Sequence, residues 1–158
     1  MKERLITLRM TEKSYNELSK EDAELVSSAR AATDGSYAPY SNFHVGAAIR
    51  LDDGTIVTGA NQENAAFPSG ICAERTAAFY AGSKHIGRRF TAIAIAAREG
   101  GSKELTSYNI SPCAACRQVL LEYEKLAGNG IRVLMASQTN VLEADSVATL
   151  VPLAFSDF

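Results

Sequence analysis

All three cysteines of the chain fall in two short segments, and these segments constrain how it folds. Cys72 opens the run Cys-Ala-Glu-Arg, and Cys113 and Cys116 form a Pro-Cys-x-x-Cys motif further along the chain. Three thiolates occupy three corners of a tetrahedral zinc site and leave the fourth open, which distinguishes a catalytic zinc from a structural one. We therefore expect a fold that gathers both segments around one Zn²⁺, with an enzymatic role.

Composition narrows the class of protein. With 158 residues and 46% hydrophobic content, the chain is expected to form a single domain, residues 1–158, with a proper core. A net charge of -2 without a basic run argues against nucleic acid as a partner. The sequence shows no signal-peptide-like or membrane-spanning stretch, and an odd cysteine count suits reduced thiols. We expect a cytoplasmic protein without membrane association.

Hydrophobic periodicity predicts alternating helices and strands. Helices are predicted from Ser19 to Gly35, over 72–81, from a Ser111 N-cap to Gly128, and over 145–150. Strands are predicted at 43–51, 55–58, 91–97, 131–136 and near 141–142. The run 91–97 has no polar face and should be a central, doubly covered strand. These elements predict an α/β fold, a three-layer α/β/α sandwich around a mixed, mostly five-stranded sheet, with residues 1–18 an uninterpreted arm.

The predicted helices place the cysteines where thiolates are stabilised. Cys72 and the Cys113–Cys116 pair should lie at helix N-termini, with both cysteines of the pair facing inward. Arg75, three residues after Cys72, returns to the same side of its helix and can hydrogen-bond the sulfurs as an outer partner of the metal site. Glu74 is not needed as a ligand, and we predict that it is the general acid and base.

The cysteine motifs also fit less specific sites. A Cys-x-x-Cys pair by itself also fits a redox pair or half of a structural zinc site. A structural site of three cysteines and one histidine would need His44 or His85, and neither stands in a metal-ligand pattern. Both histidines are therefore expected to be ordinary residues, and the catalytic interpretation is favoured.

Five blocks of the sequence, in order, resemble those of cytidine deaminases of the small homotetrameric type. The blocks are residues 38–48, 61–65, 71–77, 111–119 and 150–155. The resemblance runs from about Ser19 to Phe155 and implies the following residue roles. Zinc is held by Cys72, Cys113 and Cys116, Glu74 is the acid and base, Arg75 tunes the thiolates, Asn61 with Glu63 holds the ribose, and Phe43, Ala73 and Phe155 contact the substrate, with Phe155 reaching a neighbouring subunit.

Two positions depart from the pattern of that family. Ala114 replaces a usual glycine, a change that a helix should tolerate, and Phe67 stands where a tyrosine is often found. Without the tyrosine hydroxyl, any hydrogen bond to the sugar from that position is lost.

The reaction that the resemblance implies is hydrolytic deamination of cytidine and 2′-deoxycytidine to the uridine forms, with release of ammonia, in pyrimidine salvage. Three other functions stay open. They are deamination of another aminopyrimidine such as a nucleoside antibiotic, editing of a polynucleotide, and a non-catalytic, zinc-stabilised binding module.

Overall fold

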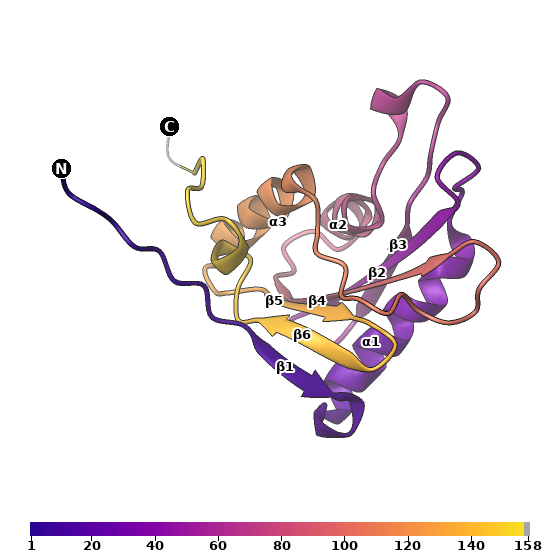
Figure 1. The fold of residues 1–158 in the computed structure, drawn as a ribbon. Coiled ribbons are helices and arrows are strands. Elements are labelled where there is room, and N and C mark those ends of the chain that lie inside the picture. Colours follow the sequence, from indigo (N-terminus) through magenta and orange to yellow (C-terminus); the bar gives the residue numbers. More distant parts are fainter. Residues whose placement is uncertain (157–158) are drawn as a thin grey trace.

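A single mixed sheet organises the structure, a computed structural model that describes residues 1–156 (Figure 1). Within these residues the sheet has six strands in the order β1-β6-β5-β4-β2-β3. The strands are β1 (Thr11–Ser14), β2 (Phe43–Leu51), β3 (Ile56–Ala60), β4 (Phe90–Glu99), β5 (Arg132–Ala136) and β6 (Asn140–Ala144). Strands β4 and β5 run parallel, and the other neighbouring strands pair antiparallel. The expected mixed sheet is confirmed.

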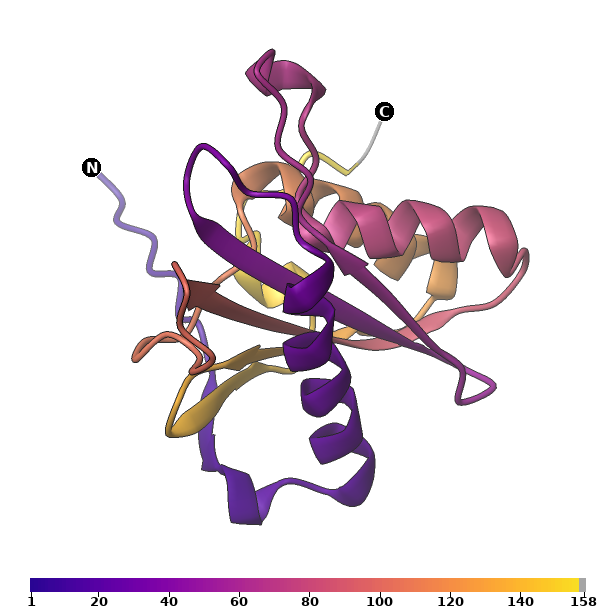
Figure 2. The same ribbon diagram turned by 90° about the vertical axis from the view of Figure 1, so that its right-hand side faces the viewer.

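Helices cover both faces of this sheet (Figures 1 and 2). They are α1 (Lys20–Ala32), α2 (Ala73–Lys84) and α3 (Ala114–Ala127). Leu25 of α1 packs on the face that presents Ala48, whereas Ala77 of α2 packs on the face that presents Ala47. Successive strand residues point to opposite faces, so one strand serves two hydrophobic cores. The three-layer α/β/α arrangement is as predicted.

Strand β4 is the central strand that its uniformly apolar sequence predicts. It lies between β2 and β5, and its side chains divide between the two cores. Ile93 and Ile95 face α2 and α3, and Ala94 faces α1. At the start of α1, the predicted cap is also present, because the Ser19 hydroxyl accepts a hydrogen bond from the backbone N–H of Asp22 at 3.1 Å.

Three element predictions need correction. The sheet has a sixth strand, β1, because residues of the expected arm pair with β6; this segment is polar and exposed, so no apolar alternation marks it. Helix α2 continues past Gly82 to Lys84, because this glycine packs under the ring of Tyr123 and does not stop the helix. The stretch 145–150 forms only a 3₁₀ turn, Ala148–Leu150.

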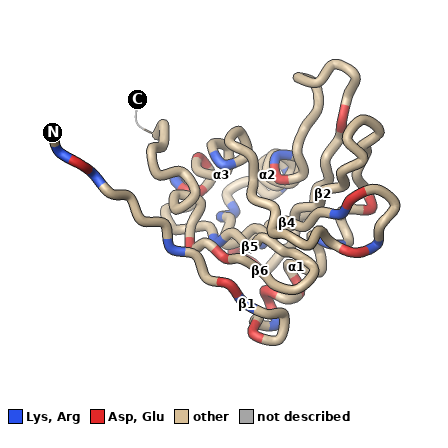
Figure 3. The backbone as a smooth tube through the Cα atoms, in the orientation of Figure 1, with Lys and Arg blue, Asp and Glu red and all other residues tan. Residues whose placement is uncertain are grey.

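Residues 1–10 extend away from the sheet (Figure 1), and each is exposed. Basic and acidic residues are distributed over the whole chain (Figure 3), in keeping with its net charge of -2. None of the helices in the described part of the chain has the length and apolar character that a membrane crossing requires.

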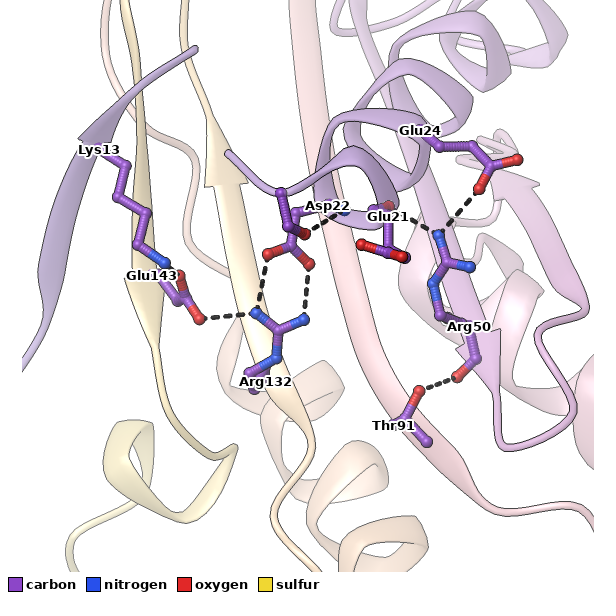
Figure 4. A network of polar contacts seen from close by, with 9 residues as sticks. Lys13, Glu21, Asp22, Glu24, Arg50, Thr91, Arg132 and Glu143 are labelled. Carbon is purple, nitrogen blue, oxygen red and sulfur yellow. Dashed lines mark hydrogen bonds and ion pairs between the residues drawn. The ribbon is translucent and has the colours of Figure 1, made fainter. Parts of the chain in front are cut away.

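A buried ion network joins the N-terminal strand to the rest of the sheet (Figure 4). Arg132 of β5 lies between Asp22 of α1, at 2.6 Å, and Glu143 of β6, at 2.9 Å. Both carboxylates are only 5% exposed, and Glu143 also pairs with Lys13 of β1. The hydrogen bonds from Arg132 hold the pKa of Asp22 below its ordinary value. One guanidinium therefore neutralises two buried acids from separate elements.

We expect Arg132→Met to destabilise the protein by about 3 kcal/mol in denaturant unfolding at pH 7. Removing one partner of a buried pair costs about 3–5 kcal/mol, and the 39% exposure of the Arg132 side chain places the loss at the lower end. Because the pKa of Asp22 is lowered in the folded protein, the contribution of its ion pair to folding stability is complete at pH values above the ordinary pKa of 3.8. It is lost as pH falls through the folded-state value, so the difference from wild type should shrink in acid.

Arg50→Met is the matched control. Arg50 pairs with Glu24 at 3.2 Å, but that carboxylate is 63% exposed and stays hydrated when its partner is removed. The expected loss is about 1 kcal/mol or less. Equal losses for the two variants would show that burial of the carboxylates does not set the strength of the network.

Candidate active site

The two cysteine-bearing segments meet at one point. The Sγ atoms of Cys72, Cys113 and Cys116 all lie within 4.8 Å of one another, and those of Cys72 and Cys113 are 3.8 Å apart. All three thiols are free. A tetrahedral zinc with Zn–S bonds of about 2.3 Å separates its sulfur ligands by about 3.8 Å. The donor chemistry and the spacing both fit zinc.

The cysteines occupy the predicted helix N-termini. The two cysteines of the Cys-x-x-Cys motif, Cys113 and Cys116, do not both face inward as predicted. Cys72 is the N-cap of α2, and Cys113 is the N-cap of α3, which begins at Ala114 and not at Pro112. Cys113 has extended backbone (φ −65°, ψ 165°) and is exposed, whereas Cys116 lies within the helix and is buried. A cap residue does not follow the helical repeat, so its side chain leaves the apolar face on which Cys116 lies.

Electrostatics favour thiolate at this centre. Hydrogen bonds from Cys116 and from Arg75 lower the pKa of Cys72 to about 5. The Nη2 atom of Arg75 donates to Cys72 Sγ at 3.8 Å. The hydrogen bond to Cys72 and burial raise the pKa of Cys116. Cys72 therefore ionises more readily than Cys116, and metal binding would release the proton of Cys116, because thiolates are the ligand form.

Glu74 lies in the first turn of α2, directly beside these sulfurs. Its side chain is almost fully buried, with the residue 4% exposed, and burial raises its pKa to about 7, a shift that the charge of Cys72 reinforces. A carboxyl group with such a pKa can both accept and donate a proton near neutral pH. This is the property that a general acid and base requires.

A cavity of about 490 Å³ adjoins the cysteine cluster. Its wall includes Cys72 and Arg75 together with residues from two loops. The loop residues are Tyr40, Ser41, Asn61, Gln62, Glu63, Asn64, Phe67, Gly70 and Ile71. The volume lies in the range of small-molecule pockets. One loop, residues 61–71, projects from the body of the protein (Figure 1).

Asn61 stands at this wall but is also part of the scaffold. Its Oδ1 accepts from the backbone N–H of Val45 at 2.8 Å, and its Nδ2 donates to the carbonyl of Phe43 at 2.9 Å. An amide side chain has two N–H donors and two lone pairs. One donor and one lone pair are therefore left for a ligand.

Glu63 is held as a charged acceptor at the same wall. One carboxylate oxygen accepts from the backbone N–H groups of Tyr40 at 2.9 Å and Ser41 at 3.2 Å, and the other accepts from the Ser41 hydroxyl. The Ser41 hydroxyl and these backbone donors lower the pKa of Glu63. The carboxylate is thus ionised at neutral pH.

The other sequence-predicted substrate residues lie elsewhere. Among the described residues, Phe43, Ala73 and Phe155 do not line the cavity. Ala73 is buried under the sheet in the first turn of α2, and Phe155 is 70% exposed, with its carbonyl bonded to Gln118 of α3. Their roles in substrate binding stay predictions.

The sequence does not predict several cavity residues as site residues. Five of them lie inside the motif blocks, and Phe67 is singled out only for the hydroxyl that it lacks; the five are Tyr40, Ser41, Gln62, Asn64 and Ile71. Phe67 is exposed and stacks edge-on against Tyr40, with ring centroids 5.9 Å apart. These two rings meet from separate loops, so no local pattern signals the contact. His44 hydrogen-bonds Ser36, and neither histidine belongs to the metal-binding group found in the described residues.

A three-cysteine centre with an adjacent buried glutamate and an open cavity is that of a zinc-dependent hydrolase. Residues 19–127 match the model of the cytidine and deoxycytidylate deaminase zinc-binding region. The chain belongs to this family, and it has the means to bind one Zn²⁺ per subunit.

Named relatives agree over most of the chain. It is 40% identical over 133 residues to the cytidine deaminases of Sporosarcina psychrophila and Halalkalibacterium halodurans, which covers 84% of this chain and 90% and 92% of those proteins. The crystal structure of cytidine deaminase from Burkholderia pseudomallei is 38% identical, with a TM-score of 0.68, covering 84% of this chain and 97% of that one. Residues 1–18 precede the family match.

We expect Gly59→Ala to disturb the metal site from a distance. A Cβ at Gly59 of β3 would lie 2.5 Å from Ala77 N and 2.7 Å from Ala73 O, so α2 must shift, and it carries Cys72 and Glu74. Overpacking of this kind costs about 1–3 kcal/mol in unfolding free energy. Zinc release to a chromogenic chelator should be faster than from wild type. Gly101→Ala is the control, because a Cβ there would meet nothing within 4 Å.

Proposed function

We propose that this protein deaminates cytidine and 2′-deoxycytidine hydrolytically to the uridine forms and ammonia. The observation that carries the proposal is the zinc-compatible cysteine cluster with buried Glu74 beside a cavity whose wall includes Asn61 and Glu63. The relatives named above are cytidine deaminases, and their similarity extends across most of this chain.

The reaction replaces the amino group at C4 of the base by oxygen from water. Zinc, when bound, supplies the Lewis acid that lowers the pKa of the attacking water. The Glu74 carboxylate takes a proton from this water and delivers it to N3 of the base, and it then passes the second proton to the departing amine. Arg75 offsets the negative charge of the thiolates.

Asn61 and Glu63 are the proposed ribose ligands. A sugar hydroxyl can donate to the fixed carboxylate of Glu63 and accept from the remaining N–H of Asn61. A free base would leave these polar groups without partners, at a cost in binding. This pair should therefore select a nucleoside over free cytosine.

The direct test is a deamination assay of the zinc-loaded protein on cytidine, deoxycytidine, cytosine, cytidine monophosphate and a cytosine-containing single strand. We expect turnover of the two nucleosides only, followed by absorbance and ammonia release. Turnover of the single strand would favour polynucleotide editing. No turnover of any of the five, with zinc bound stoichiometrically, would point to another aminopyrimidine or to a binding module.

Glu74→Gln should retain zinc and lose nearly all turnover. The amide keeps the size of the side chain but cannot carry a proton between water and the base, and general acid–base catalysis contributes about 10²–10⁴-fold per transfer. Metal content by atomic emission and kcat on cytidine are the measurements. Substantial residual kcat with full zinc content would remove Glu74 from the proton-transfer role.

Glu63→Gln should raise the KM for cytidine roughly 10- to 100-fold with a smaller change in kcat. A hydrogen bond to a charged group contributes about 1.5–3 kcal/mol, and the amide lacks the charge. Glu104→Gln, at an exposed acid outside the cavity, serves as the control. An unchanged KM in Glu63→Gln would exclude the proposed ribose contact.

We also propose that the protein is a homotetramer and that it acts in the cytoplasm, in pyrimidine salvage. Its N-terminal segment, residues 1–10, is proposed to contribute to the assembly of the tetramer. Leu5, Ile6, Leu8 and Met10 are exposed on residues 1–10, ahead of the strand that the ion network holds. Removing residues 1–10 leaves β1 intact. A tetramer of unchanged mass and stability in sedimentation would exclude a role of this segment in assembly.

A further inference from the structure

The loop that leads to Cys113 is held in place by side chains. Residues 107–113 contain no helix or strand, and Cys113 itself is the exposed cap of α3. Asn109 fixes the middle of this loop by donating to the Met135 carbonyl at 2.7 Å and to Asn140 Oδ1 at 3.0 Å. Asn109 does not contact Ser111 and Pro112 through these bonds, and a different side chain holds these two residues.

Arg117 provides this attachment with three directed hydrogen bonds. Its Nε donates to the Pro112 carbonyl at 2.7 Å, and its Nη2 donates to the Ser111 hydroxyl at 2.6 Å. The third bond runs from Nη1 to the Leu150 carbonyl at 3.2 Å, in the segment that follows β6. The planar guanidinium thus connects the cysteine loop to the C-terminal part of the chain.

The position of Arg117 makes this contact relevant to the metal centre. Arg117 follows Cys116 directly, so its backbone moves with the buried sulfur, while its side chain grips the two residues before Cys113. The backbone N–H of Arg117 also donates to the Cys113 carbonyl at 2.9 Å, so this residue contacts both Cys113 and the two residues before it. We propose that Arg117 is a positioning residue that holds Cys113 in ligand geometry. This inference rests on the zinc role of the cysteines proposed above.

Lysine cannot reproduce this arrangement. The three acceptors need donors spread over a rigid fork, whereas an ammonium group presents its donors from a single nitrogen. Outer partners that orient metal ligands typically change metal affinity by about 10–100-fold when removed. We expect a loss of this size in Arg117→Lys, with the overall fold retained.

Cobalt is the probe for this test. In Co²⁺-substituted protein, the thiolate-to-metal absorption bands report the ligand set, and chelator competition reports affinity. Arg117→Lys should shift these bands and weaken Co²⁺ binding about 10–100-fold. Ser111→Ala, which removes one acceptor, should show a smaller effect in the same direction. The double variant should lose less affinity than the two single losses combined, because both act through one contact.

Arg98→Lys is the matched control. Arg98 also donates to three acceptors, namely Thr33 Oγ1, the Ser102 carbonyl and Asp34, but these lie beside α1. It should lose thermal stability and keep the wild-type cobalt spectrum.

The possible outcomes separate this proposal from the zinc assignment. Unchanged spectra and Co²⁺ affinity in folded Arg117→Lys would overturn the positioning role. If Arg117→Lys does not fold, Ser111→Ala decides, and a wild-type spectrum and affinity in that variant would overturn it as well. Wild-type protein without thiolate bands would instead contradict the zinc site itself.

Discussion

The gathering of three cysteine sulfurs at one point is the constraint on which the site depends, because sulfurs that become thiolates repel one another. The three sulfurs lie within 4.8 Å of one another, and they come from two segments that are distant in sequence, with Cys72 in one and Cys113 and Cys116 in the other. The N-termini of α2 and α3 direct their positive ends at the cluster, and Arg75 adds a formal charge beside Cys72. The sheet places both helices on the same face, so the fold itself creates the local field that thiolates and a cation need.

The packing of α2 on the sheet also accompanies the burial of Glu74. Helix α2 approaches β3 so closely that a Cβ at position 59 would meet the backbone of Ala73 and Ala77, and Glu74 on the same helix is only 4% exposed. A carboxyl group in such surroundings has a raised pKa and can exchange a proton at neutral pH. The proposed proton-transfer group and one of the three clustered cysteines, Cys72, are therefore placed by the same helix, α2. The buried network around Arg132 lies across the sheet and ties α1 and the N-terminal strand to the same framework.

The polar groups of the cavity belong to the scaffold and are also the proposed ribose ligands. Asn61 uses half of its hydrogen-bonding capacity to secure the start of β2, and Glu63 uses its oxygens to order the turn at Tyr40 and Ser41. Groups fixed in this way lose little further freedom on binding, which favours affinity for a small polar ligand. The rings of Phe67 and Tyr40 lie at the same wall on two loops.

The sequence by itself determined the cysteine set, the adjacent glutamate, the layer architecture and the family, because motif spacing and apolar periodicity are local properties. Tertiary structure decided the rest. Polar strand β1 is held by its pairing with β6, and Cys113 is exposed at the N-cap of α3 although its sulfur joins the cluster. The cavity wall is built from separate segments, and the hydrogen bonds of Arg117 connect the loop before Cys113 to the segment after β6. Contacts of this kind depend on how elements pack, which no local pattern encodes.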